Sequence, residues 1–158
     1  MENDTENMKK LPGFVKGWTI TDLVFSAFRI IFIPLSIIGY NVLADEDPIK
    51  KTAILEIIFH VLILISGLSA NITILLRKQI GHLLGKINVG VGIASFTLVF
   101  IQLPIQLAQN EGNNAVYIGM LIGAIFTLLI RVALLVFYAI SVKRYGVFIN
   151  YEAKGEID

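Results

Sequence analysis

The sequence contains no cysteine, so this chain has no disulfide, no thiol nucleophile and no cysteine-ligated metal of its own. Histidine is scarce as well, because only His60 and His82 occur and they lie far apart. The chain also lacks any run of five or more like charges, the pattern of a basic arm that binds nucleic acid. We therefore expect no metal, no cofactor and no nucleic-acid partner.

Charged residues are few, at 16% of the chain, whereas soluble domains carry about 25%. Hydrophobic residues reach 56% and the mean hydropathy is +0.77, which makes a lipid bilayer the natural solvent. A hydrocarbon core of about 30 Å is crossed by about 20 apolar residues in a helix. Four such stretches fill most of the 158 residues and predict a single-domain, all-α integral membrane protein, a four-span antiparallel transmembrane helix bundle.

Short polar segments separate the four stretches. The expected bundle covers residues 17–143, and polar tails are expected at residues 1–16 and 144–158. Pro34 and Pro104 lie inside the first and third spans, where each is expected to kink its helix. In chain order, the expected spans are about residues 19–43, 52–76, 87–108 and 115–142.

Lysine and arginine are divided unevenly between the two ends of these spans. Nine belong to the tails and the middle connection, Lys50 and Lys51 lie at the other end, and Arg29 and Arg131 lie within spans. Cytoplasmic segments carry the excess of positive charge, so both termini are predicted to be cytoplasmic. The same charges are expected to attract anionic lipid headgroups. The Ile- and Asn-rich composition favours a bacterial inner membrane.

Each span carries polar residues at helical spacing, so that they share one face. Hydrocarbon penalises such residues, so these faces are expected to turn inward and hydrogen-bond across a polar bundle core. Gly67, Gly119 and Gly123 lie near these faces and are expected to let helices approach closely. The residues with an expected structural role are Asp22, Asn71, Asn88, Ser95, Thr127 and Tyr138.

Arg29 and Arg131 are the unusual members of these faces. Each lies about 15 Å from the cytoplasmic end of its span, near the middle of the bilayer. A central arginine costs about 2.5–3.5 kcal/mol on insertion scales. Glu56 is the one carboxylate expected within reach, which leaves a positive excess suited to an anionic group or to an acidic residue of a partner. In the structural alternative, Arg29 pairs with Glu56 while Arg131 bonds to carbonyls and to glutamine or tyrosine side chains.

Glu56 and His60 stand one helical turn apart in the outer half of the second span. They suit a proton relay, because histidine titrates near neutral pH; alternatively, Glu56 caps its helix and His60 is a hydrogen-bonded structural residue. Gln102 and Gln106 lie at the same depth on the third span, as links between helices or as ligand contacts. The candidate ligand-binding residues are therefore Arg29, Arg131, Glu56, His60, Gln102 and Gln106.

No nucleophile–base pair stands out, so we do not expect an enzyme, and an enzyme acting on lipid remains a third hypothesis without such support. Small size favours a non-enzymatic accessory or assembly subunit of a membrane complex, whose arginines bond a partner helix. The alternative is a small oligomeric transporter or channel-like protein that binds an anionic group at Arg29 and Arg131 while Glu56 and His60 titrate. The expected partners are accordingly other membrane subunits or further copies of this chain.

Overall fold

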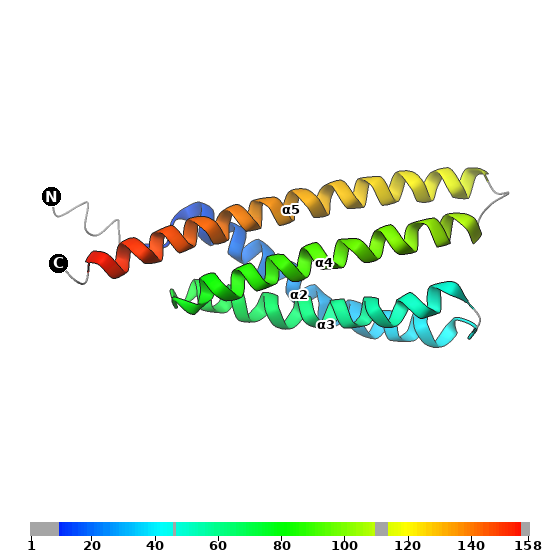
Figure 1. Cartoon of the computed structure of the whole chain (residues 1–158), viewed down its shortest axis with the longest axis horizontal. Helices are drawn as coiled ribbons and strands as arrows, with labels where there is room; N and C mark the ends of the chain where they lie inside the picture. The colour runs from blue at the N-terminus through cyan, green and yellow to red at the C-terminus, as the bar shows by residue number, and fades with distance from the viewer. Residues whose placement is uncertain (1–9, 46, 110–113, 156–158) are drawn as a thin grey trace.

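The computed structural model describes residues 10–45, 47–109 and 114–155, and the regular secondary structure of these residues is entirely helical. Four long helices follow one another and alternate in direction (Figure 1). Each is long and apolar enough to cross a membrane, with a mean hydropathy between 1.8 and 2.6 over its most apolar stretch, which confirms the predicted set of four helices. Their bounds are α2 Gly13–Val42, α3 Pro48–Leu75, α4 Ile80–Gln109 and α5 Asn114–Gly155.

The helices are longer than the apolar stretches that predict them. α4 begins at Ile80 rather than near residue 87, and α5 runs beyond residue 142 to Gly155. Helical backbone hydrogen bonds do not require apolar side chains, so a helix continues into polar sequence until a turn ends it. Much of the expected basic connection therefore belongs to α4, and most of segment 144–158 is helical rather than an extended tail.

The turn between α3 and α4 is closed by its own backbone. The Lys78 amide donates to the Thr73 carbonyl at 2.8 Å, and the Arg77 amide donates to the Ile74 carbonyl at 3.0 Å. These two bonds form the Schellman motif of a helix C-terminus, in which Arg77 adopts a φ of 54°. This left-handed conformation is one that glycine adopts without strain.

At the opposite end of the bundle, two acidic residues organise the turn between α2 and α3. Asp47 accepts a hydrogen bond from the Ile49 amide at 2.8 Å and so caps the start of α3. Lys50 donates to the exposed carboxylate of Asp45. This hydrogen bond and the nearby ammonium charge hold the pKa of Asp45 below its usual value.

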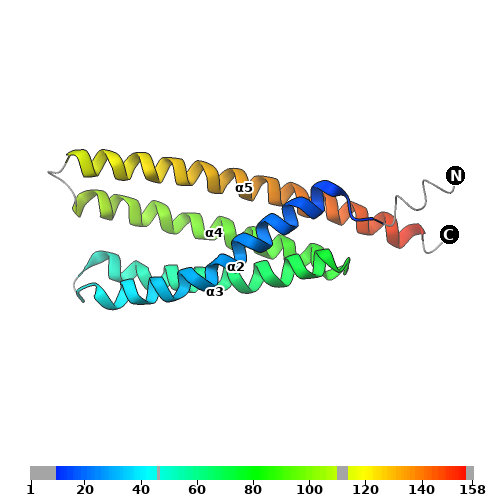
Figure 2. The ribbon, with the colours of Figure 1, turned by 180° about the vertical axis from the view of Figure 1, so that it is seen from behind.

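The packed core lies near the basal end of the bundle, the end at which α2 begins and α5 ends. Here Trp18 stacks on Phe137 with ring centroids 4.7 Å apart, and the Tyr145 hydroxyl donates to the Lys78 carbonyl at 2.8 Å. Beyond this point α2 crosses α5 and diverges from it to run beside α3 (Figure 2). The buried residues of this core are Val15, Ile74, Tyr138, Val142, Tyr145 and Ile149.

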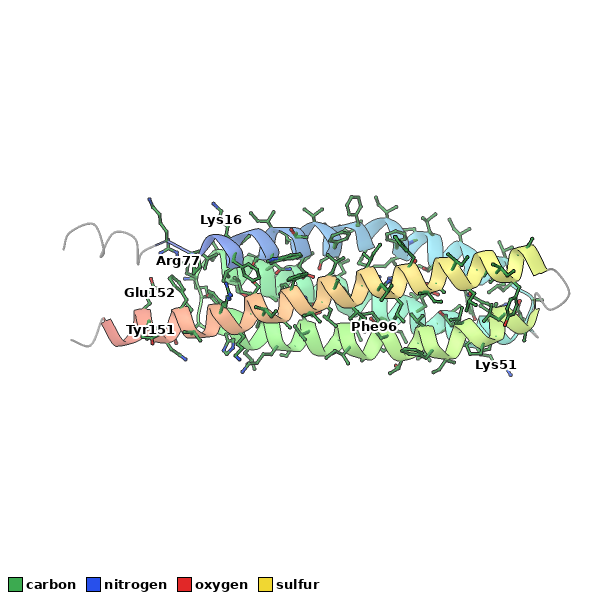
Figure 3. All side chains as sticks on the ribbon, turned by 90° about the horizontal axis from the view of Figure 1, so that it is seen from above. Lys16, Lys51, Arg77, Phe96, Tyr151 and Glu152 are labelled. Atoms are coloured by element: carbon green, nitrogen blue, oxygen red, sulfur yellow. The ribbon has the colours of Figure 1, made fainter. Side chains whose placement is uncertain are left out.

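Most apolar side chains of the four helices face outward. Only 0–22% of the residues in the most apolar stretch of each helix are buried, so each helix presents an apolar surface that lipid or another chain must cover. Lys16, Arg77 and Glu152 mark the basal end, and Lys51 lies at the distal end (Figure 3).

Only one of the three glycines expected at close helix contacts, Gly67, lies at such a contact in the described residues. A Cβ at Gly67 would overlap the Ser26 side chain, so α2 and α3 do approach closely at Gly67, as expected. A Cβ at Gly119 or Gly123 would meet no atom within 4 Å, so the expected close approach is wrong for this pair. The reason is that Gly119 and Gly123 lie on an exposed part of α5.

Candidate functional site

Three helices meet at the carboxylate of Asp22. Its Oδ2 atom accepts hydrogen bonds from Asn71 Nδ2 of α3 at 2.7 Å and from Asn88 Nδ2 of α4 at 3.0 Å. Asn88 Oδ1 accepts a further bond from Ser66 Oγ of α3 at 2.9 Å. Both amide side chains are buried. The structure thus brings together three residues predicted on separate helices and adds Ser66, which the helical spacing of polar residues did not single out.

A second group of contacts, the Arg29–His60–Glu56 chain, connects α2 to α3. Arg29 Nη1 lies 2.5 Å from His60 Nδ1, and His60 Nε2 lies 3.5 Å from Glu56 Oε1. A guanidinium donates and never accepts, so Nδ1 must be the acceptor and the imidazole proton must sit on Nε2, facing Glu56. Neutral His60 therefore separates the arginine from the glutamate, where the structural alternative expected them in direct contact.

The tautomer of His60 has a chemical consequence. A second proton on the ring would occupy Nδ1, and the hydrogen bond from Arg29 could not form. The same proton would strengthen the attraction between His60 and Glu56, since an imidazolium would then face a carboxylate.

Glu56 is also joined to α4. Gln102 Nε2 lies 3.3 Å from Glu56 Oε2 and 3.3 Å from Thr52 Oγ1. Gln106 lies one turn farther along α4 and is half-buried. Gln102 therefore links α4 to α3, which is one of the two roles expected for it.

A cavity of about 700 Å³ lies between the four helices, and the charged residues of the site surround it. This volume is within the range of about 300–1,000 Å³ that small-molecule sites occupy. Gln102 and Gln106 do not line it, which separates them from the other candidate ligand-binding residues. The ionisable lining residues are Asp22, Arg29, Glu56, His60 and Arg131.

Arg131 is the contribution of α5 to this cavity. Its side chain is exposed, and within the described parts of the chain no hydrogen bond or ion pair joins it to another residue. Thr127 and the buried Tyr138 line the same cavity from α5. The carbonyl, glutamine or tyrosine partners that the structural alternative expects for Arg131 are thus absent from residues 10–45, 47–109 and 114–155.

Aromatic side chains form much of the remaining wall, and the sequence analysis did not identify them. The Phe32 ring stacks over His60 with centroids 6.1 Å apart. Phe25, Phe28 and Phe32 are spaced three and four residues apart, a helical pattern that could have revealed them. Besides Tyr138, the aromatic lining residues are Trp18, Phe25, Phe28, Phe32 and Phe96, the last of which is labelled in Figure 3.

Ser95 also lines the cavity, but its hydroxyl donates to the Gly92 carbonyl of its own helix at 2.7 Å.

Among the residues that the structure describes, no group of three or more histidine, aspartate or glutamate side chains could hold a metal ion. Comparisons with family models, with curated proteins and with solved structures found no match to this chain.

Proposed function

We propose that this chain is a small membrane-spanning binding or transport protein that holds an amphipathic anion in the cavity between its helices. One observation carries the proposal: Arg29 and Arg131 line the same cavity, and neither forms an ion pair with a carboxylate in the described residues. Asp22 and Glu56 line the cavity too, but their side chains contact asparagine, glutamine and histidine side chains.

The energetic argument concerns the two guanidinium groups. A central arginine costs about 2.5–3.5 kcal/mol in a bilayer, and this cost falls when the charge meets a partner. A carboxylate, sulfonate or phosphate placed between Arg29 and Arg131 would accept charge-assisted hydrogen bonds from both. Arg131, which forms no hydrogen bond or ion pair among the described residues, therefore favours an anionic group as the head of the ligand.

The walls of the cavity favour an apolar body for the same ligand. Phe25, Phe28 and Phe32 line it from α2 and are each about half exposed, and Ile130 is similar on α5. In a bilayer these exposed side chains contact acyl chains, so a ligand dissolved in the membrane reaches the cavity between α2 and α5 without crossing a polar surface. An aliphatic or aromatic tail would pack against these rings.

We further propose that His60 links anion binding to proton uptake. The charged groups that line the cavity around His60 are Glu56 on α3, Asp22 and Arg29 on α2, and Arg131 on α5. When His60 binds a proton, Arg29 loses its hydrogen bond to Nδ1 and becomes available to the anion.

The lysine distribution supports an orientation for this protein. With nine lysine and arginine residues at one end and two at the other, both termini are proposed to face the cytoplasm, in the inner membrane of a bacterium. Cysteine variants near each end, labelled in sealed vesicles by a membrane-impermeant maleimide, test this orientation because the wild-type chain has no thiol.

Palmitate is a suitable probe of the cavity, and hexadecanol is its uncharged control. Native mass spectrometry of the whole chain in a non-ionic detergent should show palmitate bound and hexadecanol unbound. Arg29→Gln and Arg131→Gln should each weaken palmitate binding by about tenfold or more, the value of one hydrogen bond to a charged group. Arg144→Gln, on the exposed part of α5, should leave binding unchanged. Equal binding by wild type and both cavity variants would refute the proposal.

A second candidate, an accessory or assembly subunit, is favoured by a different observation. The most apolar stretch of α5 has no buried residue, so this helix has a surface free for a helix of another chain. In that case Arg131 would pair with an acidic residue of the partner. A photoreactive amino acid at position 131 would then crosslink one partner protein in native membranes, whereas the binding function predicts crosslinks to lipid-like ligands.

A further inference from the structure

A second cavity, the basal groove, lies between α4 and α5 and is separate from the arginine cavity. Its volume is about 350 Å³, and the two cavities share no lining residue. α4 and α5 lie side by side in both ribbon views (Figures 1 and 2). The lining residues used below are His82, Lys86 and Val89 of α4 and Ala139, Lys143 and Gly146 of α5.

The groove changes from polar to apolar along the helix axes. α4 begins at the basal end, so His82 is outermost, Lys86 follows one turn deeper and Val89 is deepest. α5 runs in the opposite direction, so Ala139 is deep, while Lys143 and Gly146 lie progressively nearer the basal end. His82 and Val89 are separated by about 10 Å of helix. Val147 and Asn150 also line the outer end, so the groove runs from a mixed outer end, past the level of the two lysines, to an apolar inner end.

Gly146 allows the imidazole of His82 to sit at this outer end. A Cβ added to Gly146 would lie 2.5 Å from His82 Nε2 and 2.6 Å from His82 Cε1. The ring therefore rests against the bare backbone of α5, where any larger residue would displace it. A side chain at position 146 would therefore push the His82 ring out of its place in the wall of the groove.

The two lysine charges have no acidic counterpart in the groove. Lys86 and Lys143 line it, and no aspartate or glutamate does so among the described residues. Arg144, the neighbour of Lys143, instead lies over the Phe14 ring of α2, with its guanidinium carbon 4.5 Å from the ring centroid. Two lysines facing one groove repel each other unless an anion lies between them.

We propose that the basal groove binds one anionic phospholipid. Its phosphate lies between Lys86 and Lys143, with His82 as a further hydrogen-bonding group, and one acyl chain runs along Val89 and Ala139. The gradient of polarity matches that of a lipid, whose headgroup lies at the membrane surface and whose chain points inward. Long lysine side chains bury their methylene groups and keep the ammonium at the interface, which suits this position. The proposal does not rest on the function of the arginine cavity.

The test compares phosphatidylglycerol with phosphatidylcholine, which share acyl chains and differ in net charge. The whole chain, exchanged into mixed micelles, is expected to retain one phosphatidylglycerol in native mass spectrometry and to lose phosphatidylcholine readily. The double variant Lys86→Gln/Lys143→Gln should lower phosphatidylglycerol affinity about thirtyfold, as two charges of about 1 kcal/mol each predict. Lys16→Gln/Lys51→Gln, which also removes two exposed charges, should change this affinity much less.

Gly146→Val gives a second, independent variant, since the added side chain displaces His82 and closes the outer end of the groove. It should lower phosphatidylglycerol retention without a change in net charge. Arg131→Gln, in the other cavity, should leave retention intact, so failure of this proposal and failure of the arginine site are distinguishable. Equal retention of both lipids, or full retention by the double lysine variant, would overturn the proposal. Displacement of the lipid by millimolar inorganic phosphate would likewise overturn it and assign the groove to a soluble anion.

Discussion

Replacement of Gly67 by alanine tests how closely α2 and α3 pack where Gly67 of α3 meets Ser26 of α2. The new Cβ would overlap Ser26 Oγ and lie 2.8 Å from Ser26 Cβ. Rotation of the Ser26 side chain removes the first conflict but not the second, because Cβ is fixed by the backbone. The two helices would have to separate by roughly 0.5 Å or more to restore an ordinary carbon–carbon contact.

The expected cost follows from two opposing effects. Overpacking of a close contact destabilises by about 1–3 kcal/mol. Alanine also favours the helix over glycine by about 1 kcal/mol, so the net loss for Gly67→Ala should be about 0–2 kcal/mol. Gly90→Ala is the matched control, since Gly90 is exposed on α4 and an added Cβ there meets nothing within 4 Å. Gly90→Ala should therefore show only the gain in stability of about 1 kcal/mol that alanine gives a helix.

Reversible unfolding in mixed micelles, followed by circular dichroism, measures both variants. Ser26→Gly should rescue Gly67→Ala in a double-mutant cycle, whereas Ser26→Ala should not, because it keeps the Cβ atom. Equal stability of Gly67→Ala and Gly90→Ala would refute the argument. Full rescue by Ser26→Ala would also refute it, since only the hydroxyl would then have been in conflict.

Four more outcomes are expected from the same unfolding assay. Asp22→Leu leaves two buried amide donors without their acceptor and should cost about 1–3 kcal/mol, whereas Asp22→Asn keeps an acceptor oxygen and should cost less. Tyr145→Phe removes a hydroxyl that donates to a turn carbonyl and should cost about 0.5–1.5 kcal/mol; a neutral result would mean that water replaces this bond. Arg77→Gly should gain about 1 kcal/mol, because glycine adopts the left-handed conformation without strain, and a loss would show that the arginine side chain matters more. Lys50 lowers the pKa of Asp45 in the folded state, so the contribution of Asp45 to stability is present at neutral pH and is lost as the pH falls below about 4. Asp45→Asn should remove that part of the pH dependence, and an unchanged pH profile would contradict the pairing.

The four helices were predictable because hydropathy is a property of the sequence itself. Their ends were not, because polar residues after residue 142 include no proline and so do not stop a helix. Pro34 and Pro104 lie inside helices that continue past them, as expected from their places within the first and third apolar stretches. Composition therefore gives the apolar part of each helix, and the turns decide its length.

The site was predictable as a set of faces and not as a set of contacts. Asp22, Asn71 and Asn88 were expected on inward faces, and they do bond to one another. Glu56 and His60 share a face one turn apart, so spacing alone could not decide which of them Arg29 would contact. That choice depends on the rotation and separation of α2 and α3, which arise from contacts along the whole pair of helices.

The unbroken course of α5 has a mechanical consequence. Arg131 faces the cavity, and about 36 Å of the same helix separates it from Gly155 at the basal end. A continuous helix transmits tilt along its length, so a tilt of about 10° that pivots at Tyr138, about 26 Å from Gly155, would move the basal end by roughly 4 Å. The core around Tyr138 and Tyr145 lies between these points and would act as the pivot. Any change in the tilt of α5 at the cavity would therefore appear as a displacement near Gly155.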